Sequence, residues 1–364
     1  MIKKGKLFAH LASGDEVRLF DNSLVFSFSG PRKVLSTSVC NGGFREDLTA
    51  AWNQDMSRDI GGMLASSYEA YLLHSAEGLG LDPKRATGMG TTAHMENAAI
   101  ETLSYRELTV STISTGGIES NGGRAGDPAR HFQPCGKPRP GTINLMLSIN
   151  ADLPPGTLAR ALVTCTEAKA AALQELMADS RYSGGLATGS GTDQTILVAN
   201  PESGLRLDDA GKHSKLGELI GRTVIAAVKS GMAKQHGLTP KRQHDLLRRL
   251  RRFGVTEETV WGACERLFDD RTVPKEAFLA SLRVLSSSSP IFSEGVLYIH
   301  LLDEHVWGLL EEGETQQTAL RILRGLAAAY GLSPPEEVKE PYPQAMELLL
   351  AQISYHQLQK ASKN

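Results

Sequence analysis

The sequence predicts an α/β or α+β layered domain, whose helices cover both faces of its sheets, followed by an all-helical C-terminal appendage. Before about residue 235, short segments rich in β-branched residues alternate with helical patterns, and glycines separate them. After about residue 236, glycine becomes scarce and helical periodicity takes over. We therefore expect two domains, residues 1–235 and residues 236–364.

Strand character recurs through the first domain. Residues 17–39 carry β-branched and aromatic residues on both sides of Ser29-Gly30-Pro31, which is typical of paired strands. Three further strands are predicted near residues 110–115, 142–149 and 195–199.

Helical periodicity marks the remaining elements. In the first domain it predicts a helix over residues 156–177, entered through two prolines, and another over residues 216–231 with Ser214 as its N-cap. In the second domain it predicts helices over residues 240–253, 257–268, 275–285, 296–312, 315–330 and 343–359.

Composition excludes several classes of protein. The chain has 364 residues, of which 41% are hydrophobic and 22% charged, so disorder is excluded as its main state. No run of about 18 apolar residues occurs, and the N-terminal residues lack the apolar segment of a secretory signal, so we expect a cytoplasmic protein. The net charge of −2 makes nucleic acid an unlikely partner for the whole protein.

One basic stretch keeps a second interpretation open. Residues 241–252 hold six basic residues in twelve, which fits the first helix of a helix-turn-helix. The preferred interpretation is an amphipathic helix that turns its leucines inward and its basic face to solvent.

Cysteines and histidines give no support for a metal site. The four cysteines (Cys40, Cys135, Cys165 and Cys264) are far apart without a C-x-x-C pair, so each is expected to be a small buried hydrophobe. No histidines of the first domain stand at ligand spacing.

Two glycine loops suggest phosphate binding, but a plain turn explains them better. Thr188-Gly-Ser-Gly-Thr-Asp193 leads into a strand rather than a helix, and no Gly-Lys-Ser/Thr follows it. Thr87-Gly-Met-Gly-Thr-Thr92 lacks the same lysine. We therefore expect a tight glycine turn at residues 188–193, and the same caution speaks against a phosphate site at residues 87–92.

A third group of residues has the composition of a catalytic site. Thr142 opens a predicted strand directly after Gly141, and Asn144 points to the same face. The segment around Thr115 and Gly116 offers backbone N–H groups to a developing oxyanion. By spacing alone this signal is weak, because Gly-Thr pairs are common in turns.

Seven stretches resemble the adenosylcobinamide amidohydrolase family. They follow one another at sensible spacings over about residues 20–232: Val34-Leu-Ser-Thr-Ser-Val-Cys-Asn-Gly-Gly43, Thr87-Gly-Met-Gly-Thr-Thr-Ala-His-Met95, residues 114–127, Gly141-Thr-Ile-Asn144, Thr164-Cys-Thr-Glu-Ala-Lys-Ala-Ala171, residues 187–193 and His213-Ser-Lys-Leu-Gly-Glu-Leu-Ile-Gly221. The residues after about 236 lie outside the resemblance.

The resemblance implies hydrolysis of the amide that joins aminopropanol to the corrin ring of adenosylcobinamide, giving adenosylcobyric acid for cobalamin salvage. It implies a small-molecule corrinoid partner, which is substrate rather than cofactor, and no cofactor of the protein itself. A homo-oligomer is compatible with it, and no membrane partner is expected. Residues of the matching blocks become candidates for substrate binding: Asn41, Gly42, Asn121, Arg124, Asn144 and Glu167.

A second resemblance bears on mechanism. The order of the blocks is similar to that of ornithine acetyltransferases and related self-processing aminopeptidases. This implies β-sheets sandwiched between helices, Thr142 as nucleophile, and Thr115 and Gly116 as oxyanion donors. Whether the Gly141–Thr142 bond is cut to free an α-amine stays open.

Proton transfer has three candidates within the blocks, His213, Asp193 and Glu167. His213 has the best claim, because histidine as a residue type suits acid–base work near neutral pH, although a surface histidine at a helix entrance explains it equally well. The alternative function is a non-catalytic corrinoid-binding or regulatory protein with a helical tail that binds a partner or DNA.

Overall fold

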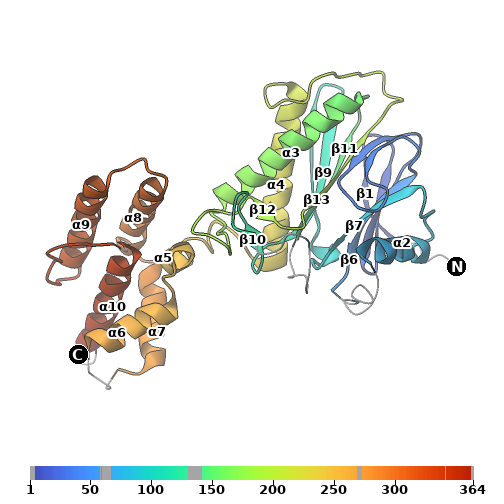
Figure 1. Cartoon of the computed structure of the whole chain (residues 1–364). Helices are drawn as coiled ribbons and strands as arrows, with labels where there is room; N and C mark the ends of the chain where they lie inside the picture. The colour runs from blue at the N-terminus through green and yellow to red at the C-terminus, as the bar shows by residue number, and fades with distance from the viewer. Residues whose placement is uncertain are drawn as a thin grey trace. The chain divides into compact units, whose positions relative to one another are not determined.

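The computed structural model describes residues 5–57, 59, 67–129, 142–268, 273–340 and 342–361. The chain divides into two compact units, Met1–Thr239 and Pro240–Asn364 (Figure 1). Each is built around cores of its own.

The first sheet of the N-terminal unit has five strands. Only β6 and β7 are parallel neighbours, and the other pairs are antiparallel. Helix α2 (Tyr68–Gly78) packs Leu72 and Ala76 against Trp52 on the outer face of this sheet. In spatial order the strands are β1 (Lys6–His10), β2 (Glu16–Phe20), β3 (Ser23–Ser27), β6 (Ala50–Asp55) and β7 (Ala86–Thr91).

The second sheet has six strands and carries most of the predicted site. Its central strand β11 lies parallel to β13 and antiparallel to β9. The order is β5 (Gly43–Arg45), β4 (Lys33–Ser36), β13 (Gln194–Ala199), β11 (Thr142–Ile149), β9 (Leu108–Gly117) and β8 (Ala99–Tyr105). A short antiparallel ladder joins β10 (Gly122–Gly123) to β12 (Gly189–Ser190), and the 3₁₀ turn η1 (Met95–Asn97) precedes β8.

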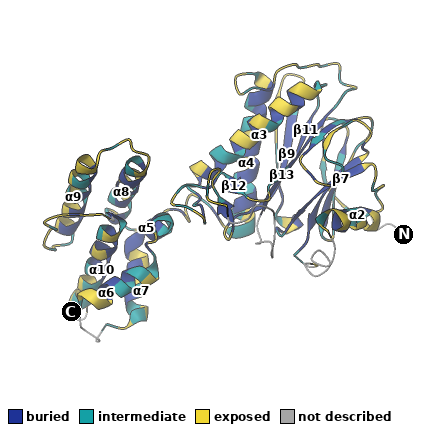
Figure 2. Ribbon diagram, viewed as in Figure 1, coloured by how far each residue is buried: buried dark blue, intermediate teal, exposed yellow. Residues whose placement is uncertain are grey.

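Two long helices cover the outer face of the second sheet (Figure 2). Helix α3 is Pro155–Glu175 and helix α4 is Lys215–His236. Ser214 caps α4 as predicted, accepting a hydrogen bond from the Gly217 N–H. The helix does not close near Gly231 but continues to His236, where Gly237 ends it at φ 63°.

The two sheets pack face to face over a third apolar core. Phe26 and Met89 of the first sheet meet Ile113, Met146 and Ile196 of the second. The layers are therefore helix, sheet, sheet and helix pair. The predicted fold, β-sheets sandwiched between helices with a helical C-terminal appendage, is confirmed.

All secondary-structure elements among the described residues of the C-terminal unit are helices. Two helices differ from the prediction: the one expected from residue 240 begins only at 246, because Asp245 caps it, and the one expected over 296–312 spans 291–306. Its elements are α5 (Leu246–Leu250), η2 (Arg251–Phe253), α6 (Glu257–Leu267), α7 (Lys275–Ser286), α8 (Ile291–Val306), α9 (Glu312–Ala329) and α10 (Tyr342–Ala361).

The basic stretch at the start of this unit contributes to its packing. Leu246, Leu247 and Leu250 are buried in the core, as expected for an amphipathic helix. Arg252, 3% exposed, donates two hydrogen bonds to the carboxylate of Asp303, with distances of 2.6 and 2.5 Å. Part of the basic charge is therefore neutralised within the fold.

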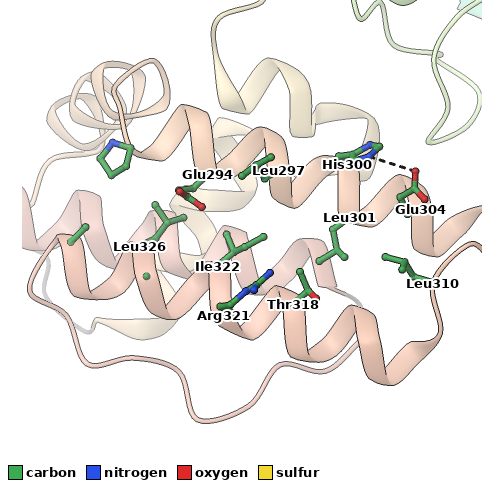
Figure 3. A pocket seen from close by; sticks show the side chains of 13 residues that line it. Glu294, Leu297, His300, Leu301, Glu304, Leu310, Thr318, Arg321, Ile322 and Leu326 are labelled. Atoms are coloured by element: carbon green, nitrogen blue, oxygen red, sulfur yellow. Dashed lines mark ion pairs between the residues drawn. The ribbon is translucent and has the colours of Figure 1, made fainter.

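A groove of about 730 Å³ lies between α8 and α9 (Figure 3). Leu297, Leu301, Ile322 and Leu326 line it, and an ion pair between His300 and Glu304 stands at its rim. None of the residues predicted for the site lies in this unit.

Two further expectations concern single residues and whole helices. Cys40, Cys165 and Cys264 are buried free thiols, as predicted, while Cys135 lies outside the described residues. Across the described ranges no helix is long and apolar enough to span a membrane.

Candidate active site

Thr142 is the first described residue of β11, and Gly141 with the bond between them lies outside the described residues. The threonine is 3% exposed and stands opposite Gly117 of β9. Its side chain faces the first sheet, because Asn144, two residues on along the strand, donates a hydrogen bond to Asn53 of β6.

The Thr142 hydroxyl belongs to a cluster of three. Its Oγ1 lies 2.8 Å from Thr192 Oγ1 and 3.5 Å from Ser190 Oγ. Both partners come from the loop of residues 188–193, which forms β12 and the turn into β13. The predicted turn is confirmed, and it brings two hydroxyl groups to the start of β11.

Asp193 holds this turn on the strand. Its carboxylate accepts hydrogen bonds from the N–H groups of Ile143 (2.8 Å) and Ser190 (2.9 Å), from Ser190 Oγ (2.6 Å) and from Lys169 Nζ (2.5 Å). Gly189 is required beside it, since a Cβ there would lie 2.2 Å from Asp193 Oδ2. Four donors satisfy this carboxylate, so its position fits an anchor of the strand that begins with Thr142 better than the predicted proton carrier.

A chain of amide groups continues from β11 to the first sheet. Asn144 Nδ2 donates to Asn53 Oδ1 (2.8 Å) and to the Gly90 carbonyl (3.1 Å), and Asn53 Nδ2 donates to Thr115 Oγ1 (2.7 Å). The Gly90 carbonyl only accepts, which fixes the orientation of the Asn144 amide. Asn144 Oδ1 is then left buried with no hydrogen-bond partner among the described residues.

Tyr68 closes this polar layer on the side of β13. Its hydroxyl accepts from the Gly90 N–H (2.8 Å) and donates to Gln194 Oε1 (2.9 Å). Burial raises the pKa of Tyr68 to about 12, so the phenol stays protonated at neutral pH.

The facing strands β11 and β6 run in opposite directions across the interface between the sheets. Ser148 Oγ lies 3.2 Å from Ser13 Oγ, at the end of the first sheet where β6 begins. The asparagine pair lies midway, so Thr142 is at the end where β6 finishes with Asp55.

That end of the interface holds a histidine–carboxylate pair. His94 Nδ1 lies 3.0 Å from Asp55 Oδ2. The carboxylate is 2% exposed, whereas the imidazole is 50% exposed. Asp55 Oδ1 also accepts from the Ser57 N–H at 2.8 Å, which fixes the carboxylate.

The last turn of α4 contacts both His94 and Gly117, the strand partner of Thr142. Gln235 Oε1 accepts from the His94 N–H at 3.1 Å. The ring of His236 fills the place of a side chain at Gly117, since a Cβ there would lie 2.0 Å from its Nε2. Because Gly117 pairs with Thr142, the His236 ring lies against the residue that opposes the threonine.

Several predicted binding residues flank the cluster. The β10–β12 ladder pairs Gly122 with Ser190, which places the buried Asn121 and the exposed Arg124 beside the hydroxyl loop. Asn41 uses its amide to bond the carbonyls of residues 83 and 86, both at 2.7 Å. A Cβ on Gly42 would lie 1.9 Å from the Ser38 carbonyl oxygen. Asn41 and Gly42 therefore shape a turn, and their role in substrate binding stays a prediction.

Thr115 and Gly116 lie on the part of β9 that β8 does not pair with, because β8 begins at Ala99, opposite Ser114. Thr115 accepts a hydrogen bond through its hydroxyl, and Gly116 packs against Met232 of α4. Their part in an oxyanion hole stays a prediction.

The structure does not bring His213 or Glu167 to Thr142. His213 is exposed before the first turn of α4, and the 18 residues from Ser214 to Met232 beside Gly116 rise about 27 Å. Glu167 lies on the solvent face of α3, where its ion pair with Lys212 (2.7 Å) lowers the pKa of its carboxyl.

The sequence analysis missed Asn53, Asp55, His94 and Lys169 as site residues. His94 and Lys169 stand inside blocks that matched the family, but neither has a local signal in the sequence comparable to the position of His213 at a helix entrance. Asn53 and Asp55 alternate on one face of a strand, a pattern of polar residues in an apolar segment that marks a site. Among the described residues, no three His, Cys, Asp or Glu side chains are grouped to hold a metal ion.

The fold and site define a sandwich of two sheets between helices, with a hydroxyl cluster, an amide chain and a histidine–carboxylate pair at one end of the interface. Family comparison then identifies the chain. Residues 9–240 match the adenosylcobinamide amidohydrolase (CbiZ) family, and the chain belongs to it.

Individual proteins resemble the same region. The uncharacterized protein MJ1613 of Methanocaldococcus jannaschii is 30% identical over 227 residues, which are 58% of this chain and 86% of that protein. Among solved structures, the PH0078 protein of Pyrococcus horikoshii OT3 aligns over 70% of this chain and 90% of its own, with 15% identity and a TM-score of 0.32. A Burkholderia sp. beta-aminopeptidase covers 64% of this chain and 82% of its own, with 13% identity and a TM-score of 0.29.

Proposed function

We propose that this protein hydrolyses the amide between aminopropanol and the corrin ring of adenosylcobinamide, releasing adenosylcobyric acid for cobalamin salvage. Membership of the amidohydrolase family over residues 9–240 supports the reaction class and the substrate. The observation that carries the assignment to a site is the Thr142 hydroxyl, held at the start of β11 within a cluster of three hydroxyl groups. The corrinoid is the substrate, and its cobalt needs no protein ligand.

In this proposal Thr142 Oγ1 attacks the carbonyl carbon of the amide. The resulting acyl-threonine is then hydrolysed by water. The anchor formed by Asp193 and Lys169 supports this role, because it fixes the backbone of Ile143, next to the nucleophile. Thr115 and Gly116 supply donors to the oxyanion.

The amide chain supports recognition of a secondary amide. Thr115 Oγ1 accepts from Asn53, so its own proton is free to point to another acceptor, such as a carbonyl oxygen. Asn144 Oδ1 is an acceptor that lacks a partner among the described residues, and an amide N–H would satisfy it. One donor and one acceptor are what a secondary amide requires.

The test uses the full chain and two matched variants. Purified protein is incubated with adenosylcobinamide, and aminopropanol and adenosylcobyric acid are quantified. We expect Thr142→Ala to lower turnover at least about 100-fold while corrinoid binding by equilibrium dialysis is retained, and Thr142→Ser to keep part of the activity.

Two results would contradict the proposal. Tight corrinoid binding without aminopropanol release would favour the non-catalytic binding protein. Near-parental turnover by Thr142→Ala would exclude the acyl-enzyme mechanism and favour direct attack of water on the amide.

A further inference from the structure

We propose that His94, oriented by Asp55, carries the proton in this hydrolysis, a role that rests on the proposed function of the site. A threonine hydroxyl is a poor nucleophile unless a base takes its proton. The two hydroxyl groups that contact Thr142 are not basic, and the Asp193 carboxylate is engaged by four donors.

The His94–Asp55 pair has the construction of an acid–base group. A carboxylate buried to 2% exposure bonds Nδ1, and the ring is half exposed. The Asp55 carboxylate accepts a hydrogen bond from Nδ1–H, which leaves Nε2 with its lone pair. Within the described residues Nε2 makes no hydrogen bond, so it is available to substrate.

The position of His94 fits an exchange across the interface. Thr142 belongs to the second sheet and Asp55 to the first, and packed sheets lie about 10 Å apart. Both groups stand at the same end of that interface, where Gln235 of α4 accepts a hydrogen bond from the His94 N–H and His236 lies against Gly117, the strand partner of Thr142. An amide placed between the sheets meets the threonine from one side and the imidazole from the other, directly or through one water.

The proton balance closes with His94 alone. Its Nε2 takes the proton of Thr142 Oγ1 as the O–C bond forms, and returns it to the amide nitrogen as the C–N bond breaks and aminopropanol leaves. Water then gives one proton to Nε2 and its oxygen to the acyl carbon. The same proton passes to Thr142 Oγ1 as the ester bond breaks and adenosylcobyric acid is released. Asp55 stays ionised throughout.

His236 is the competing candidate, because its ring lies against Gly117, which pairs with Thr142. Its carboxylate neighbour, Glu119, is 4.0 Å from Nδ1 and 44% exposed. A distant, solvated carboxylate orients an imidazole less firmly than a buried one at 3.0 Å. The choice between the two histidines therefore falls on His94.

The experiment measures kcat and KM for aminopropanol release by His94→Ala, Asp55→Asn and His236→Ala, with His74→Ala as the control. His74 is 87% exposed on α2. We expect His94→Ala to lower kcat about 100-fold or more with little change in KM, and added imidazole to restore part of it. Asp55→Asn keeps an acceptor for the Ser57 N–H but presents an NH₂ group to Nδ1, so kcat falls because the wrong tautomer is favoured.

A second substrate separates this proposal from the proposed function. Hydrolysis of 4-nitrophenyl acetate also needs an activated Thr142 but no corrinoid. If the parent protein cleaves the ester and not adenosylcobinamide, the proposed function fails, while loss of esterase activity in His94→Ala still supports the pair. Three results would overturn the assignment to His94. The first is a parental kcat of His94→Ala on the substrate that the protein cleaves, and the second is a loss of kcat confined to His236→Ala. The third is that the protein cleaves neither substrate.

Discussion

Replacing Asp193 by asparagine tests whether this carboxylate is a structural anchor. The side chain keeps its shape, and one oxygen still accepts from Ile143 N–H and Ser190 Oγ. The new NH₂ group, however, faces Lys169 Nζ and the Ser190 N–H, both of which are donors. The lysine then stands as an unpaired ammonium group with only 12% exposure.

The magnitude follows from that unpaired charge. Removing one partner of a buried ion pair costs about 3–5 kcal/mol of unfolding free energy. In a unit of this size each kcal/mol shifts the melting temperature by about 2–4 °C, so the first unit should lose roughly 6–20 °C. Adding Lys169→Met to Asp193→Asn removes the ammonium and should restore most of the loss.

Urea and thermal unfolding followed by circular dichroism measure the effect. Glu167→Gln is the matched control. It breaks an exposed ion pair on α3, the helix that also carries Lys169, and should leave the melting temperature unchanged. If the unfolding free energy of Asp193→Asn stays within about 1 kcal/mol of the parent while turnover is lost, the structural role is refuted and Asp193 takes part in the reaction.

Two further predictions concern the domain boundary and alkaline stability. Residues 1–239 should fold and hydrolyse adenosylcobinamide alone, because no described residue after Leu238 belongs to the three cores of the first unit. A chain that ends at residue 235 would lack both Leu238 and His236. A 1–239 fragment that folds but is inactive would assign the helical unit to the active site. Burial raises the pKa values of Tyr68 and Cys165 to about 12, from ordinary values of 10.0 and 9.0. Above about pH 9 the unfolded chain therefore loses protons that the native protein keeps, so the native state becomes less stable. The urea concentration at the unfolding midpoint should be constant below about pH 9 and fall toward pH 12. A constant midpoint over that whole range would contradict this prediction.

Elements with strong local signals were predictable from the sequence. The β-branched runs of β9 and β11 needed no tertiary information, and neither did the Ser214 cap of α4. Helix α2 was missed because its polar and apolar residues do not separate into clear faces. The end of α4 was placed too early, since Gly231 is an interior residue and Gly237 is the true cap.

The chemistry of the site was predictable only in part. Thr142 and Asn144 share a face because strand residues alternate, which the sequence states directly. The pairing of His94 with Asp55 spans 39 positions and depends on how two strands of a sheet end together. Likewise Asp193 carries a charge in a glycine loop, and only the packing of α3 and β11 supplies the donors that occupy it.

Covalent catalysis by Thr142 can be tested by mass spectrometry of protein quenched during turnover. We expect a mass increase equal to one adenosylcobyryl group, located by peptide mapping at Thr142 and absent from Thr142→Ala. Steady release of aminopropanol with no adduct on Thr142, together with parental turnover by Thr142→Ala, would contradict it.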